Sequence, residues 1–137
     1  MKKLLAGLLL FLLPVTSAAY PFMVGVRVST PQIVSVSLTF RPATLWFLQA
    51  EPGVGGCKAA LGIGGSWDYH FGIALKSSVL YTWGKTIGDV ETHQTYAGGE
   101  GMIMVSGINL TFGLYGHIAG DDKEKDMLVS VGAGVGF

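Results

Sequence analysis

The sequence predicts an all-β fold, an antiparallel up-and-down meander of about eight strands closed into a barrel. Hydrophobic residues make up 50% of the 137 residues and charged residues 13%, against about 25% charged in typical globular chains. After the N-terminal segment, no apolar run reaches the roughly 18 residues that a transmembrane helix needs. The 21 glycines disfavour long helices, and apolar residues recur with the period of two that is typical of strands.

The N-terminus has the features of a secretory signal peptide. Lys2 and Lys3 precede the apolar stretch Leu4 to Leu13, and small residues follow at 16–19. We therefore expect residues 1–19 to be a signal peptide and residues 20–137 to be the barrel domain, with an uncleaved anchor as the alternative. The remaining chain has seven basic and nine acidic residues, and it lacks the concentrated basic surface that nucleic-acid binding requires.

Eight segments have the alternation or the composition of strands, with turn residues between them. They are residues 22–29, 33–40, 44–51, 57–64, 71–83, 95–105, 108–118 and 127–137. The segment 33–40, IVSVSLTF, has the cleanest polar face. The pattern leaves the register open in 44–65 and 95–107, because the first begins with apolar residues on both faces and the second has a glycine-rich middle.

The longest segment, 71–83, has one nearly continuous apolar face. This face holds Phe71, Ile73, Leu75, Val79, Tyr81 and Trp83, with only Ser77 polar. Twelve residues at ~3.3 Å rise, tilted by ~40°, span about 30 Å, close to the ~25 Å apolar band of membrane barrels. Aromatic residues gather at both ends of the segment, as they do in the girdles of such barrels.

The last segment, MLVSVGAGVGF, places Met127, Val129, Val131, Ala133, Val135 and Phe137 in one register. With the signal peptide and the girdles, this ending resembles bacterial outer-membrane β-barrels, whose assembly machinery reads a terminal aromatic residue. The resemblance covers the mature chain in pattern and about ten residues in motif, and it identifies no subfamily. It implies an outer-membrane location, contact with membrane lipid and lipopolysaccharide, and an assembly signal at Phe137, Val135 and Ala133.

The connections have the asymmetry of such barrels. If both chain ends lie on the periplasmic side, the polar connections 84–94 and 120–126 face outward. The short connections 41–42 and 106–107 then face the periplasm, as expected for periplasmic turns.

The polar register predicts a barrel interior filled by side chains, because eight strands leave no open pore. The residues expected inside are Arg27, Ser35, Ser37, Thr39, Lys58, Lys76, Thr82, Asn109, Thr111, Tyr115 and His117. Glu51 and Glu100 are the expected counter-charges. We interpret this set as a hydrogen-bonded core that pairs its buried charges, and a ligand pocket is the alternative.

One stretch is similar to the His-x-Ser/Thr spacing of outer-membrane lipid A deacylases. It is His93-Gln94-Thr95, with Glu100 downstream, so threonine stands in place of the serine nucleophile. The match consists of three residue types, and a catalytic triad also needs hydrogen-bond contact among its members. His93, Thr95 and Glu100 are therefore catalytic candidates, and a solvated loop histidine is the alternative.

No cofactor or metal site is expected. His70, His93 and His117 lack the close spacing of metal ligands, and the acidic loop 121–126 lacks the pattern of a calcium loop. The single Cys57 excludes an intramolecular disulfide and suits a small apolar position.

The sequence thus predicts a small outer-membrane barrel, expected to be a monomer, with a structural or surface-interaction role and no evident catalytic activity. The alternatives are a lipid-modifying enzyme of the deacylase kind and a secreted soluble β-barrel that binds an apolar ligand. The register of 71–83 separates the membrane and soluble alternatives, because its apolar face points outward in the first and inward in the second.

Overall fold

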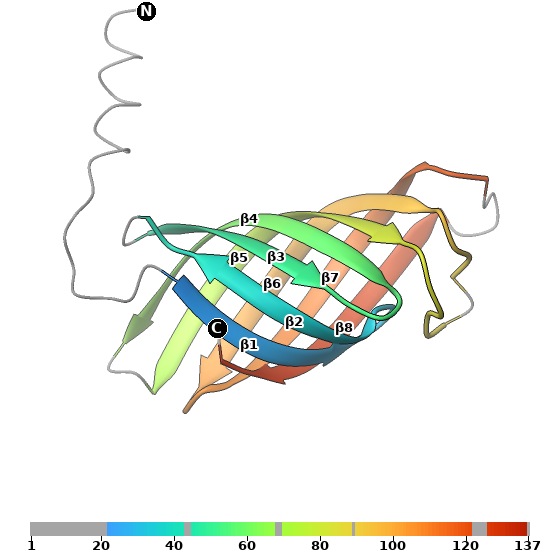
Figure 1. The fold of residues 1–137 in the computed structure, drawn as a ribbon. Helices are drawn as coiled ribbons and strands as arrows, with labels where there is room; N and C mark the ends of the chain where they lie inside the picture. Colours follow the sequence, from blue (N-terminus) through green and yellow to red (C-terminus); the bar gives the residue numbers. More distant parts are fainter. Residues whose placement is uncertain (1–21, 43–44, 68–69, 89, 122–125, 137) are drawn as a thin grey trace, which may run out of the picture.

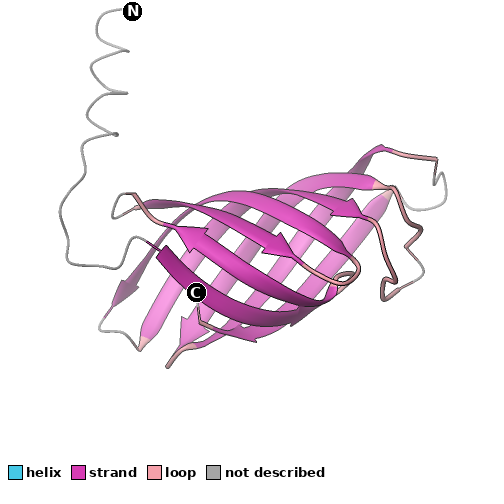
Figure 2. Cartoon of the chain, in the orientation of Figure 1, coloured by secondary structure: helices cyan, strands magenta, loops and turns pink. Residues whose placement is uncertain are grey.

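The computed structural model describes residues 22–42, 45–67, 70–88, 90–121 and 126–136. In these residues, eight antiparallel strands close into one barrel, each bonded to the next and β8 to β1 (Figures 1 and 2). The strands are β1 (Phe22–Ser29), β2 (Ile33–Phe40), β3 (Trp46–Pro52), β4 (Gly56–Trp67), β5 (Phe71–Thr82), β6 (Thr95–Val105), β7 (Ile108–Ala119) and β8 (Met127–Val135). The predicted fold class is confirmed. The expected signal peptide lies outside the described residues.

Two strand boundaries differ clearly from those expected. The glycines and serine at 64–66 suggested a connection, but β4 continues through them to Trp67. Gly64 and Gly65 pair with Ala74 and Ile73, so the ladder with β5 continues without a break. Strand β3 runs from Trp46 to Pro52 instead of from residue 44 to 51. None of the described residues forms a helix with the length and apolar character needed to cross a membrane.

The side chains alternate between the interior and the exterior along the strands. In β5 every second residue is buried, starting at Gly72, while Phe71, Ile73 and Leu75 are exposed. In β3, where the sequence left the register open, Phe47, Gln49 and Glu51 point inward. The barrel therefore has a polar and charged interior and an apolar exterior.

The strands differ in length around the barrel. Strands β1, β2 and β3 have 8, 8 and 7 residues, whereas β4 to β7 have 12, 12, 11 and 12. We call the first three strands the short wall and β5 to β7 the tall wall. Strand β1 pairs with β8 only from Val26 to Ser29, because β1 ends at Ser29 and β8 ends at Val135, the partner of Val26.

The turns at one end of the barrel bond to each other, and we call it the loop end. The amide N–H of Gly55, between β3 and β4, donates to Gln32 O at 3.0 Å. The N–H of Ile87, between β5 and β6, donates to Pro31 O at 3.1 Å. The opposite end, which we call the inner end, carries the β2–β3, β4–β5 and β6–β7 connections and the beginning of β1 (Figure 1).

At Gly62 of β4, the packing of the interior leaves no room for a side chain. Phe47, across the β3–β4 ladder, lays its ring over Gly62, and a Cβ atom there would lie 2.8 Å from Phe47 Cε1. Glycine therefore makes room for the Phe47 ring, which belongs to the apolar cluster at the inner end of the interior. Gly65, on the same strand, has open space at its Cβ position.

We expect the substitution Gly62→Val to lower the free energy of unfolding by about 1–3 kcal/mol, because the new side chain collides with the Phe47 ring. Urea unfolding of the purified barrel, followed by tryptophan fluorescence, measures this change. Gly65→Val is the matched control, since it brings the same strand propensity without a collision, and its change should stay near zero. Equal losses for both variants would contradict this role of Gly62.

Candidate functional site

The interior of the barrel holds a cluster of five buried charged residues, which we call the charge cluster. It consists of Arg27, Glu51, Lys58, Lys76 and Glu100, from strands β1, β3, β4, β5 and β6. Each is at most 4% exposed. The residues come from both halves of the chain, so only barrel closure brings all five together.

Each carboxylate in the charge cluster binds more than one cation. Glu51 pairs with Arg27 and with Lys58, whose Nζ lies 2.8 Å from Glu51 Oε2. Glu100 binds Lys58 Nζ at 2.7 Å and Lys76 Nζ at 2.6 Å. Lys58 therefore bridges the two carboxylates. Such multiple pairing offsets the cost of burying the charges.

Neutral side chains extend the charge cluster by hydrogen bonds. Arg27 Nε donates to Asn109 Oδ1 at 3.1 Å, and Lys76 Nζ donates to Gln49 Oε1 at 3.0 Å. Gln49 Nε2 in turn donates to Thr39 Oγ1 at 2.9 Å. The network thus takes a side chain from each of the seven strands β1 to β7.

Apolar side chains enclose the charge cluster on both sides along the barrel. Toward the inner end lie Phe47, Ala74, Met102 and Met104, with Met23 packed against them. Toward the loop end lie Leu80, Val90, Tyr96, Tyr115 and Leu128. On β6 the order Tyr96, Glu100, Met102 follows these three layers. The interior is therefore layered, with the five paired charges in the middle. Toward the inner end, the guanidinium of Arg41 lies over the Phe47 ring, with Cζ 5.8 Å from the ring centroid.

The residues expected inside from the sequence lie as follows. Arg27, Lys58, Lys76, Asn109 and Tyr115 are all at most 4% exposed. Tyr115 Oη donates to Ser78 Oγ at 3.3 Å. His117 is half-buried near the loop end, where its Nε2 lies 2.9 Å from Gln94 Oε1 and its ring packs on Tyr96.

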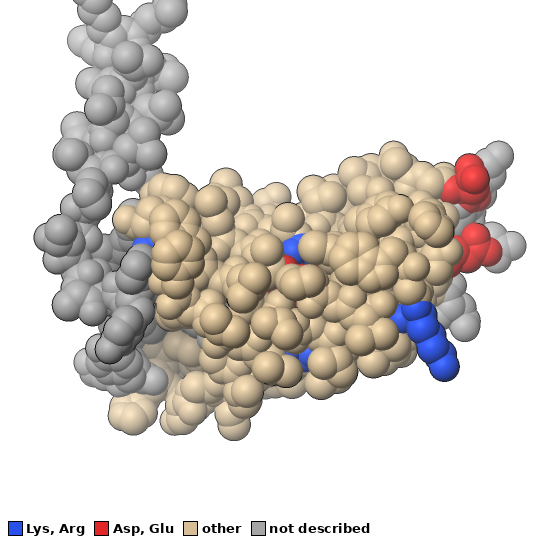
Figure 3. All heavy atoms as spheres, viewed as in Figure 1, with Lys and Arg blue, Asp and Glu red and all other residues tan. Residues whose placement is uncertain are grey.

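The exterior of the barrel is almost entirely apolar. Strand β5 exposes Phe71, Ile73, Leu75, Val79 and Tyr81, and β8 exposes Met127, Val129, Val131 and Val135. Figure 3 shows uncharged atoms over most of the visible wall, with the most prominent charged side chains at the loop end and a few charged atoms visible elsewhere on the wall. This surface is far larger than the apolar patches of a few hundred Å² that soluble monomers expose.

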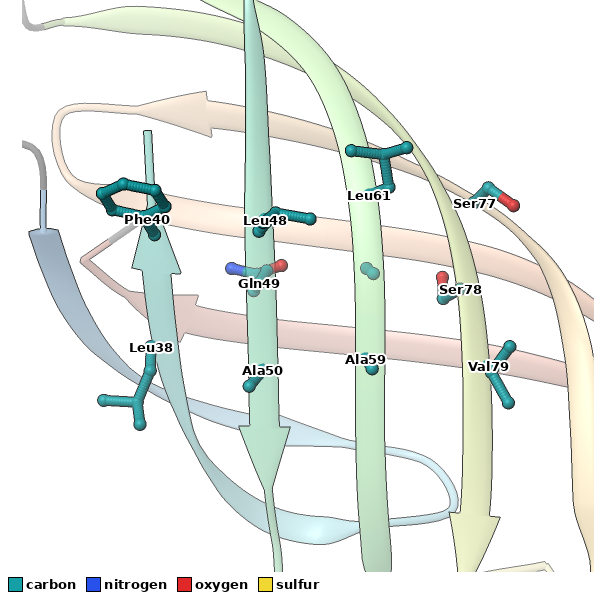
Figure 4. A pocket seen from close by; sticks show the side chains of 11 residues that line it. Leu38, Phe40, Leu48, Gln49, Ala50, Ala59, Leu61, Ser77, Ser78 and Val79 are labelled. Carbon is teal, nitrogen blue, oxygen red and sulfur yellow. The ribbon is translucent and has the colours of Figure 1, made fainter. Parts of the chain in front are cut away.

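A shallow groove crosses this exterior over strands β2 to β5 (Figure 4). Its volume is about 510 Å³, and its floor includes the small residues Ala50 and Ala59. Its sides include Leu38, Leu48 and Leu61. The groove lies on the outer wall, and its lining also includes the buried residues Gln49, Ala60 and Ser78.

The catalytic candidates do not form a common site. His93 is exposed in the β5–β6 loop, where its Nδ1 lies 3.2 Å from Thr92 Oγ1 and its ring packs against Tyr81. Glu100 binds Lys58 and Lys76 within the charge cluster. Thr95 is half-buried at the start of β6. His93 and Glu100 thus have separate sets of partners.

The other candidates are distributed as follows. Val135 and Ala133 pair with Val26 and Val28 at the β8–β1 seam, and Phe137 lies outside the described residues. Cys57 is half-buried on β4. Of the acidic loop, residues 122–125 lie outside the described residues. Within the described ranges, no group of three His, Cys, Asp or Glu residues could hold a metal ion.

Several interior residues were missing from the sequence prediction, and Gln49 and Val90 are two of them. Gln49 links Lys76 to Thr39, and the spacing of Gln49 and Glu51 by two positions could have set the register of β3. Val90, 5% exposed, leaves the β5–β6 loop to fill the barrel mouth. No sequence pattern marks Val90, because its burial results from the path of the loop.

Comparison with known proteins adds no relative: no family matches the sequence, and no curated protein or solved structure is significantly similar to the chain. The class of protein is therefore defined by the fold and its interior, a small eight-stranded antiparallel β-barrel with a buried charge cluster.

The charge cluster predicts unequal effects of removing an anion and removing a cation. It has three cations for two carboxylates, so Glu100→Gln leaves three cations with one carboxylate, whereas Lys76→Met leaves two of each. We expect Glu100→Gln to lower the free energy of unfolding by about 3–5 kcal/mol and Lys76→Met to lower it by clearly less. Urea unfolding measures both.

The matched control is Glu91→Gln, because Glu91 is an exposed carboxylate in the β5–β6 loop. Its effect should stay within about 0.5 kcal/mol. If Lys76→Met proved as damaging as Glu100→Gln, the balance of charges in the cluster would be unimportant.

Proposed function

We propose that this chain is an outer-membrane β-barrel with a structural or surface-interaction role, whose exterior contacts lipid. The observation that carries the proposal is the inverted distribution of side chains, with charges inside and a continuous apolar wall outside. In water the apolar wall would be exposed to solvent at a high cost in free energy. In a bilayer the wall contacts acyl chains, while the charges stay paired inside the barrel. A closed barrel also satisfies its backbone hydrogen bonds between strands, as a membrane requires.

Three further features support the proposal. The residues of the tall wall, 11 or 12 per strand, suffice to span a bilayer. The outer groove is lined mainly by apolar side chains, which suits acyl chains. The charged residues Lys85, Glu91, Asp121 and Asp126 lie at or next to the loop end, where they would face water and lipopolysaccharide.

The assembly route belongs to the same proposal. Strand β8 closes the barrel against β1 and presents an apolar outer register that includes Val135. We propose that the barrel-assembly machinery recognises this strand and that the export signal is residues 1–19. A monomer suffices, because closure leaves each strand with two neighbours.

The two alternatives have less support. A soluble carrier of an apolar ligand needs an apolar interior, but the apolar register of β5 points outward and the interior is charged. A lipid-modifying enzyme needs its histidine, nucleophile and acid in contact, but His93 and Glu100 have different partners. Because a fold alone does not fix function, both alternatives need a direct test.

The location is tested by fractionating expressing cells and running the outer-membrane fraction on a gel with and without boiling. We expect the protein in this fraction, with an unboiled band that migrates faster, because a closed barrel resists detergent. A protein in the soluble periplasmic fraction without a heat shift would overturn the proposal.

The contact with lipid predicts a cost for charge on the wall. Leu75 is 62% exposed in β5, and Leu75→Arg should lower the free energy of unfolding in lipid vesicles by about 2–4 kcal/mol. Ile87→Arg is the control, because Ile87 is exposed in the β5–β6 loop, and it should change little. A wall that tolerates arginine as well as the loop does would contradict lipid contact.

The enzymatic alternative is tested with His93→Ala. We expect this variant to fold normally and the acylation of lipid A, measured by mass spectrometry, to be the same with the wild-type protein, the variant and no protein. A change in acylation that requires His93 would favour the enzyme instead.

A further inference from the structure

We infer that the barrel thins the bilayer beside its short wall, so that the outer surface of the membrane dips at strands β1 and β2. This inference rests on the proposed function, because it describes how the lipid meets this wall. The interaction surface is the outer face of the short wall, and its partner is a bilayer that is locally thinner than the bilayer around the tall wall.

The first observation is the difference in strand length. Eight residues at ~3.3 Å rise and a tilt of ~40° span about 20 Å, whereas twelve span about 30 Å. The 8-residue strands β1 and β2 lie on one side, and the 12-residue strands β5 and β7 belong to the tall wall. The apolar exterior is thus a belt of uneven height.

The short wall is lower than the tall wall at the loop end of the barrel. The β1–β2 turn, at residues 30–32, is bonded to Gly55 of the β3–β4 turn, and both turns belong to the short side. Strands β7 and β8 continue past this level, since β8 begins its ladder with β7 at Met127 but meets β1 only from Gly132 onward. The wall therefore has a step at the β8–β1 seam.

The second observation is the backbone of β8 above this step. Thr30 N–H donates to Val131 O at 3.0 Å, which shows that the polar backbone groups of Val131 point toward β1. Those of Val129 and Met127 point the same way, because the direction repeats every two residues. Among the described residues, no strand lies opposite these two positions.

Unpaired backbone groups are costly in hydrocarbon, where each costs several kcal/mol, and they are satisfied in water. The edge of β8 at Met127 and Val129 is therefore stable if headgroups and water reach down to the β1–β2 turn. The short wall also requires the membrane surface to lie at the level of the β1–β2 turn, because its apolar exterior ends there. Tilting the barrel would not remove the mismatch, because tilt leaves the difference between the two walls unchanged. Local thinning of the bilayer accommodates both features.

The test compares residues at equal height above the inner end. Val34 of β2 and Leu114 of β7 each lie six residues from the inner end of their strand, and both side chains are exposed on the outer wall. Val34→Cys and Leu114→Cys, each in a Cys57→Ser background, are labelled with a nitroxide and folded into dioleoylphosphatidylcholine vesicles. Collision with a water-soluble relaxing agent and with oxygen is then measured by electron paramagnetic resonance.

We expect the label at residue 34 to collide with the water-soluble agent several-fold more than the label at residue 114. Val36→Cys and Phe112→Cys, each four residues from the inner end, are the matched controls, and both should be shielded from water. A shift on boiling confirms that each variant is folded.

The outcomes separate this inference from the proposed function. Equal shielding at residues 34 and 114 would overturn the thinning and leave lipid contact intact. Water contact at all four positions, without the oxygen collisions typical of hydrocarbon, would overturn the proposed function as well. Water contact at residue 36 but not at residue 112 would also overturn the inference as stated, because the short wall would then lie outside the bilayer.

Discussion

The structure depends on the pairing of five buried charges inside a narrow barrel. Glu51 and Glu100 share both Lys58 and Lys76, while Arg27 binds Glu51. A shift of one residue in any of the contributing strands would turn its charge to the outside, because neighbouring side chains face opposite sides of a sheet. The charge cluster therefore fixes the register of β1, β3, β4, β5 and β6 together, and closure by β7 and β8 completes it.

The exterior follows from the interior. Once the polar register faces inward, the apolar register must face outward, and 31 large hydrophobic residues in the described part of the chain remain exposed. A soluble protein would have to cover this wall with a second layer, and the described residues provide none. The bilayer proposal accounts for the wall, the layered interior and the charges at the loop end with one assumption. The uneven strand lengths then determine how the surrounding lipid must adapt.

The sequence predicts most of this fold because alternation is a local property. The bounds of β1 and β2 follow from it directly, as does the burial of Arg27 and Lys76. Other features could not be predicted, because they depend on contacts distant in the chain. The glycines at 64 and 65 suggest a turn until Ala74 and Ile73 pair with them, and the partners of Glu100 become known only when β4, β5 and β6 lie side by side. The burial of Val90 likewise depends on the path of a loop.

The most direct measurement is nuclear magnetic resonance of the methyl groups of the barrel in lipid nanodiscs. Leu75 and Val79 lie on the outer face of β5, and Leu80 lies in the interior of the same strand. We expect nuclear Overhauser effects between lipid acyl chains and the methyl groups of Leu75 and Val79, and none for Leu80. Contacts of Leu75 and Val79 with water instead of lipid would contradict the central claim that this wall faces a bilayer.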